Sequence, residues 1–319
     1  MTDFLPDSPW PEASLPVEDG TWGTPSASEA LRRARGEPAA PRRPAAALAA
    51  NINELLESMA RKRVPRLDAV RARLQEARAG GPLAEVDEAL LALHAATTGV
   101  DFLAGRSGGE RAGEFLRQGE ALAATIRRLV PRLAEFVQRE AVGAPVTRLV
   151  WIDLVIESSS LRKRVRQGAQ WLAEMDMDLL QRRKAANTDV TVRAIEELAR
   201  RGVGMHERLQ AVHRLCTQAR TVHTLSEKMA AERAALWALV QDHVLPACTH
   251  LDEALQPLLH AAAYRALVPT ELIGAIESCH TLQVDLTQAA AQIQRLRDGD
   301  GELAGQLAQM QAKASLLTA

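Results

Sequence analysis

Histidine and cysteine side chains that could bind a metal ion concentrate in the last third of the chain. Seven of the eight histidines follow residue 200. Five residues could form one Cys/His site: His243, Cys248, His250, Cys279 and His280. Imidazole and thiolate ligands suit zinc or copper. The alternative is a set of surface histidines and small buried cysteines. Pro246 disturbs the helical register between His243 and His250, so we predict no resident metal.

Sequence motifs of the common catalytic sites are absent. The chain has no Gly-rich phosphate loop followed by Lys, no dinucleotide fingerprint, no Gly-x-Ser-x-Gly elbow, no HExxH and no paired CxxC. Glu277 and His280 form the Glu-x-x-His pattern of di-iron bundles once, without the second copy that such a site needs. We therefore predict a non-enzymatic protein with no catalytic residue and no cofactor. A metal- or thiol-dependent enzyme or sensor is the alternative.

Charge is almost balanced along the chain, with 39 basic and 40 acidic residues and a formal net charge of −1. Nucleic-acid-binding proteins usually carry a clear basic excess, so this balance argues against that class. Basic clusters at 61–63, 162–166 and 182–184 could each hold an anion. No aromatic residues are interleaved with them, which favours solvated or salt-bridged helix faces.

Composition predicts an all-α protein. The hydrophobic fraction is 47% and the aromatic fraction only 3%, and strong helix formers dominate. Between Met205 and Leu245, residues from Val212 to Val240 alternate at spacings of three and four and are apolar except for Ser226 and Arg233, which is typical of an imperfect coiled-coil seam. We expect an elongated bundle of long antiparallel, partly coiled-coil helices. Glycine and proline clusters predict breaks at 80–82, 99–113, 143–145, 202–204 and 298–301. The polar residues Asn187, Thr188 and Asp189 predict a further pause, at which a helix can end and start again.

These breaks define three expected regions: a disordered Pro-rich tail at 1–45 that is first acidic and then basic, an N-terminal helical region at 46–142, and a long-helix bundle at 146–319. The segment 149–156 is apolar on nearly all sides, so we expect it to be buried between neighbouring helices. Trp151 and Trp237 lie on apolar stripes and are expected to be buried as well.

The tail carries two large aromatic residues, Trp10 and Trp22, among prolines and acidic residues. Such a segment cannot form a core of its own. We therefore predict that Trp10 and Trp22 bind a protein partner that offers a basic groove. The alternative, which the sequence does not separate from this one, is a tail that folds back onto its own domain.

Targeting signals are also absent. No stretch of about 18 uncharged apolar residues is present, and the first residues form no signal peptide. We expect no membrane span and a cytoplasmic location, in which Cys216, Cys248 and Cys279 stay reduced. Expected partners are proteins bound through the tail and the helical faces, and a homo-oligomer remains open.

The C-terminal region resembles a known family. Residues 271–277, Glu-Leu-Ile-Gly-Ala-Ile-Glu, are followed by Gln283, and the Leu236-Trp237 pair precedes them on a long helix. This pattern, which covers about the last quarter of the chain, resembles the toxic-anion (tellurite) resistance proteins of the TelA type. The resemblance implies a helical stress-response protein that acts through protein contacts and brings no catalytic residue. A scaffold or adaptor of a plasmid, phage or secretion apparatus is the alternative function.

Overall fold

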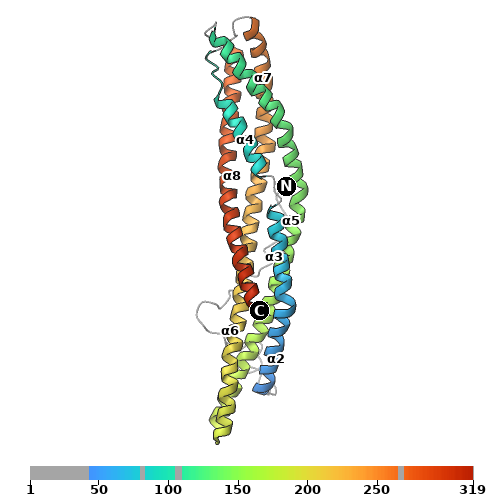
Figure 1. Cartoon of the computed structure of the whole chain (residues 1–319), viewed down its shortest axis with the longest axis vertical. Coiled ribbons are helices and arrows are strands. Elements are labelled where there is room, and N and C mark those ends of the chain that lie inside the picture. The colour runs from blue at the N-terminus through green and yellow to red at the C-terminus, as the bar shows by residue number, and fades with distance from the viewer. Residues whose placement is uncertain (1–42, 80–82, 105–109, 265–268, 319) are drawn as a thin grey trace, which may run out of the picture. The chain divides into compact units, whose positions relative to one another are not determined.

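Every regular element in the part of the chain that the structure describes is helical, so the predicted all-α fold is confirmed (Figure 1). The structure is a computed structural model, and it describes residues 43–79, 83–104, 110–264 and 269–318. Its helices are α2 (Ala45–Ser58), η1 (Met59–Arg63), α3 (Val64–Ala79), α4 (Leu83–Thr98), α5 (Glu110–Ala185), α6 (Asp189–Leu239), η3 (Val240–Val244), α7 (Leu245–Tyr264) and α8 (Pro269–Thr318), of which η1 and η3 are π-helical. Trp10, Trp22 and almost all of the tail predicted at 1–45 lie outside the described residues.

The chain divides into two compact units, and each unit is assembled from two separate segments. The first contains residues up to 63 and 160–213, and the second contains residues 64–159 and 214–319. The boundary expected between 142 and 146 falls inside α5.

The first unit packs α2 against the end of α5 and the start of α6. The backbone N–H of Ala45 donates to Asp178 Oδ2 at 2.8 Å. Pro44 supplies no side-chain cap for α2, so the Asp178 carboxylate takes that role from α5. Ten residues further along α2, Leu55 lies against Gly168, which also faces Leu209 of α6. Because Ala45 meets Asp178 while Leu55 meets Gly168, α2 runs antiparallel to α5 in this unit.

The second unit has one continuous hydrophobic core. It is built from α4, the first part of α5, the last part of α6, η3, α7 and α8. Its fully enclosed side chains include Leu93, Phe115, Leu133, Leu236, Leu255 and Leu282. The aromatic rings of Phe102 and Phe115 lie 6.0 Å apart within this core. Aliphatic side chains otherwise dominate it, as expected for closely packed helices.

Polar contacts give the directions of the helices in this unit. On α4 and α8, Asp87 pairs with Arg297, whereas the Thr97 carbonyl accepts from Gln283 Nε2 at 3.1 Å. On α6 and α8, Lys313 Nζ donates to Gln218 Oε1 at 2.6 Å, whereas Arg233 lies 3.9 Å from Asp300. In both pairs a later residue on one helix meets an earlier one on α8, so both pairs are antiparallel.

The predicted seam on α6 is confirmed. Its members from Val212 to Val240 are buried at every expected position except Arg233, which is half-buried. Arg233 approaches Glu140 and Asp300 at 3.9 Å each. The hydroxyl of Ser226, the other polar member, donates to the Val222 carbonyl at 2.7 Å. Both polar positions are therefore satisfied inside an otherwise apolar seam.

Three of the predicted breaks are wrong, because α5, α6 and α8 run without interruption through 143–145, 202–204 and 298–301. Two of the glycines serve close packing instead. A Cβ at Gly202 would lie 2.8 Å from Met175 Cε, and one at Gly299 would lie 2.1 Å from Met229 Sδ. The absence of a side chain at each position lets a methionine approach the backbone of the neighbouring helix.

The expected pause at 187–189 is confirmed, since α5 ends at Ala185 and α6 begins at Asp189. Thr188 Oγ1 accepts a weak hydrogen bond from the Thr191 N–H at 3.4 Å, in the manner of an N-cap. Pro65 and Pro246 each follow a π-helical segment, η1 and η3. The wider π turn accommodates a residue that lacks a backbone N–H.

Within the described ranges, no helix combines the length and the apolar character that crossing a lipid bilayer requires.

Candidate protein-binding face

The five candidate metal ligands do not come together as a ligand set. Cys248 and Cys279 are buried, whereas His243, His250 and His280 are exposed. Burial raises the pKa of the Cys248 thiol to about 12 and that of Cys279 to about 11, which keeps both protonated. The Cys279 thiol donates to the Thr97 carbonyl, with Sγ 3.7 Å from the oxygen. No group of three or more His, Cys, Asp or Glu side chains in the described part of the chain could hold a metal ion.

The predicted basic clusters contain ion-paired arginines. Arg61 lies 3.5 Å from Glu57 one turn earlier, and Arg182 lies 2.8 Å from Asp178. In the cluster at 162–166, two arginines act on His213 of α6. Burial, and then the charges of Arg162 and Arg166, lower the pKa of that histidine. The ion pairs of Arg61 and Arg182 agree with the prediction that the clusters at 61–63 and 182–184 lie on salt-bridged helix faces.

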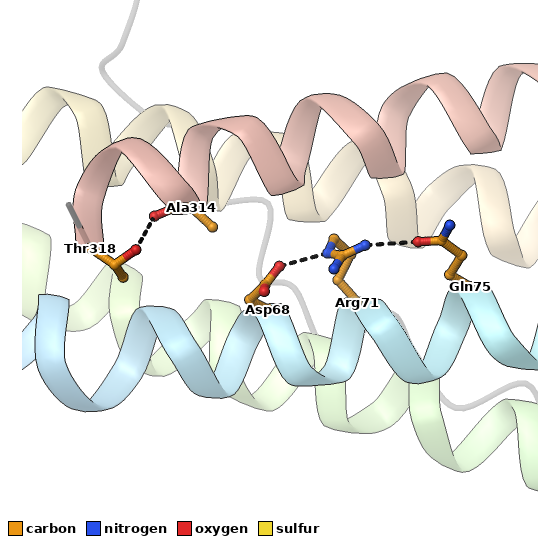
Figure 2. Close-up of polar contacts among 5 residues, drawn as sticks. All are labelled: Asp68, Arg71, Gln75, Ala314 and Thr318. Carbon is orange, nitrogen blue, oxygen red and sulfur yellow. Dashed lines mark hydrogen bonds and ion pairs between the residues drawn. The ribbon is translucent and has the colours of Figure 1, made fainter.

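One buried arginine was not singled out from the sequence. The Arg71 side chain on α3 is 6% exposed, and its Nε donates to Asp68 Oδ1 at 2.6 Å. Its Nη1 donates to Gln75 Oε1 at 2.8 Å, so partners from the same helix hold the guanidinium (Figure 2). Figure 2 also shows the last turns of α8, with Ala314 and Thr318, running beside this part of α3. The arrangement is typical of a structural arginine, since all three residues lie on consecutive turns of α3.

The strongest candidate site is an exposed apolar stripe on α5. Leu149 is 61% exposed, Ile152 47% and Ile156 57%. Their spacing of three and four residues places them on one side of the helix. Trp151 and Val155 are half-buried at the edge of this stripe. We call these five residues the α5 apolar face.

The expectation that 149–156 is buried on nearly all sides is therefore wrong, as is the expectation of a buried Trp151. Only Val150 and Leu154 of this segment are buried, and Ser158 and Leu161 continue their stripe. The buried Val150 and Leu154 lie on one side of α5, and the exposed Leu149, Ile152 and Ile156 lie on the other. Trp237 is 7% exposed, so the prediction for that residue is confirmed.

An ion pair fixes α5 beside the apolar face. Arg73 Nη1 of α3 lies 2.8 Å from Asp153 Oδ2, and both side chains remain about half exposed. Asp153 directly follows Ile152 in the sequence, so this contact borders the apolar stripe. A salt bridge of this exposure contributes at most about 1 kcal/mol, but it orients one flank of the face.

Other large apolar side chains are exposed elsewhere, including Leu91, Leu103 and Leu316. Single exposed apolar residues are normal on protein surfaces. The α5 apolar face differs, because three strongly exposed residues follow each other at helical spacing. Contiguous exposed apolar surface of this kind marks interaction sites. The sequence signal, a helix that is apolar all round, was present, but it did not show which side would remain uncovered.

Comparisons of the chain with protein-family models, with curated proteins and with solved structures found no match. The resemblance to the toxic-anion resistance proteins therefore stays a prediction.

Proposed function

We propose that this chain is a non-enzymatic, cytoplasmic helical protein that acts through protein–protein contacts and binds a partner with the α5 apolar face. The observation that carries this proposal is the exposure of Leu149, Ile152 and Ile156 on one stripe. A partner helix that presents an apolar stripe of its own fits this geometry. Enclosing a Leu or Ile side chain fully contributes about 1.5–3 kcal/mol, so three such residues can anchor a contact.

The physiological setting that we propose is resistance to toxic oxyanions, and it rests only on the resemblance carried by residues 271–277, Gln283 and the Leu236-Trp237 pair. In this setting, deletion of the gene sensitises cells to tellurite or a related oxyanion. A general scaffold or adaptor uses the same face without that phenotype. Growth of the deletion strain on tellurite therefore distinguishes oxyanion resistance from a general scaffold or adaptor role. The proposal that the α5 apolar face binds a partner does not depend on that result and has a separate test.

The test of the binding face uses Ile152→Glu/Ile156→Glu in the full chain. Two exposed apolar residues outside both the α5 apolar face and the 271–277 motif, Leu91 of α4 and Val284 of α8, supply the matched control Leu91→Glu/Val284→Glu, because they are 54% and 52% exposed. Complexes are cross-linked in the native cells and the partners are identified by mass spectrometry. We expect the α5 variant to lose a partner that the wild type and the control retain. Its free energy of unfolding should change by no more than about 0.5 kcal/mol. Equal capture by both variants would refute the assignment of the face.

A further inference from the structure

The connection between α5 and α6 forms a hairpin whose end extends past α2. The N-terminus of α2 lies at Asp178, because Ala45 donates its backbone N–H to that carboxylate. Helix α5 continues for seven residues beyond this point, to Ala185, and α6 then begins at Asp189. At 1.5 Å per residue, the last part of α5 extends about 10 Å beyond the start of α2. We call residues 180–195 the hairpin end.

Apolar side chains of the hairpin end are only partly covered. Where α2, α5 and α6 pack together, Leu172, Met175 and Leu209 are buried. In the hairpin end, Leu180 is 56% exposed and Val190 77%. Val192 and Ile195 on α6 are half-buried. The change occurs where α2 begins, so the described structure lacks a third segment over this part of the hairpin.

The hairpin end is also basic. Between residues 180 and 195 the chain carries Arg182, Arg183, Lys184 and Arg193, and the single acidic residue in that range is Asp189. Arg182 pairs with Asp178. The cations in the last turn of α5 also complement the helix dipole, which accounts for part of this pattern. The dipole does not account for the exposed Leu180 and Val190, so the surface combines positive charge with apolar contact area.

The first 31 residues of the segment that precedes α2 have the complementary chemistry, and the five arginines of this segment follow them between residues 32 and 43. Residues 1–31 contain six acidic residues and no Lys or Arg. They also contain Trp10 and Trp22, and buried tryptophans supply large apolar contact areas. The chain enters α2 at Ala45, which touches Asp178 two residues before Leu180. The 23 residues from Trp22 to Ala45 can span roughly 75 Å when extended, far more than the length of the hairpin end.

We propose that residues 1–31 dock on the hairpin end of their own chain, with Trp10 and Trp22 against its apolar side chains and the acidic residues beside its arginines and lysine. Tethering at Ala45 makes this association intramolecular, so it avoids most of the entropy cost that a separate molecule incurs. The proposal takes the second of the two roles expected for Trp10 and Trp22, a tail that folds back onto its own chain, and it is independent of the α5 apolar face.

The experiment is a disulfide-trapping comparison in the full chain. Thr21→Cys places a thiol beside Trp22 and is combined either with Asn187→Cys in the hairpin end or with Gln170→Cys on α5. Asn187 and Gln170 are both exposed, and they lie nine and eight residues from Asp178 in opposite directions. An undocked tail therefore reaches both thiols about equally. The native cysteines are buried and do not compete.

Under mild oxidation, we expect the internal disulfide to Cys at position 187 to form at least about tenfold faster than that at position 170, at a rate independent of protein concentration. Trp10→Ala/Trp22→Ala, or Arg183→Glu/Lys184→Glu, should remove this preference. Equal rates at the two positions in the parent chain would overturn the proposal. Disulfides that form mainly between molecules, and more as concentration rises, would instead place the tail on another copy and would also overturn it. A preference that survives both sets of substitutions would refute the stated chemistry of the contact.

Discussion

Trp237 and Trp151 offer a direct test of how the second unit is packed, because the same substitution is made in two environments. Trp237 on α6 is 7% exposed and belongs to the core, whereas Trp151 on α5 is only half-buried. A buried tryptophan removes about 200 Å² from water, which at about 25 cal/mol per Å² is worth about 5 kcal/mol as an upper estimate. We therefore expect Trp237→Ala to lower the free energy of unfolding by about 3–5 kcal/mol.

Trp151→Ala should cost clearly less, about 1–2 kcal/mol, since much of its ring is already in water. Trp237→Phe provides a second comparison. The indole N–H of Trp237 is buried without an acceptor among the described residues. The substitution removes that donor along with part of the ring, so its cost should lie below that of the alanine variant. Urea unfolding followed by circular dichroism measures all three values. Equal losses for Trp151→Ala and Trp237→Ala would refute the burial assignments, and with them the orientation of α5.

Two further predictions concern other parts of the molecule. Asp178→Ala should destabilise the first unit by about 1 kcal/mol, because it leaves the N-terminus of α2 without its carboxylate cap, and hydrogen exchange should show the loss in the first turn of α2. If Asp178→Asn lowers the free energy of unfolding as much as Asp178→Ala does, the loss of the cap is not the cause of the destabilisation. Burial raises the pKa of Cys248 to about 12 from the ordinary value of 9.0, so the unfolded chain loses this proton first and stability should fall as pH rises from about 9 toward 12. Cys248→Ala should flatten that slope in urea titrations between pH 8 and 11, and an unchanged slope would exclude the thiol as its source.

Periodicity in the sequence was sufficient to predict the elements that follow one uninterrupted pattern. The seam from Val212 to Val240 lies on a continuous helical stretch, and its apolar members are buried. The start of α2 at Ala45 and the pause before Asp189 were also predicted. Pro44 blocks helix extension, and Thr188 with Asp189 supplies the polar groups of a helix start. In these cases the local chemistry and the packing favour the same structure.

Glycine was misread where its role depends on a distant residue. Gly202 and Gly299 suggested breaks, since glycine costs about 1 kcal/mol inside a helix. In the structure Met175 lies against Gly202, and Met229 lies against Gly299. The packing of each methionine offsets the local cost, and both contacts join residues that are far apart in the sequence. A single sequence gives the local cost of a glycine but does not identify the side chain that fills the space beside it.

The exposure of the α5 apolar face was also not predictable from a single sequence, although the apolar pattern at 149–156 itself was recognised. A helix that is apolar on every side can be buried on every side, or it can be buried on one side and bind a partner with the other. Both arrangements require the same residues at 149–156, so periodicity does not distinguish them. The exposure of Ile152 and Ile156 opposite the buried Val150 and Leu154 favours the second arrangement. Selection for a solvated surface would favour polar residues at these positions, as on the outer faces of α6. Their apolar character is therefore best explained by a contact outside the described chain, which the paired glutamate substitutions at Ile152 and Ile156 test directly.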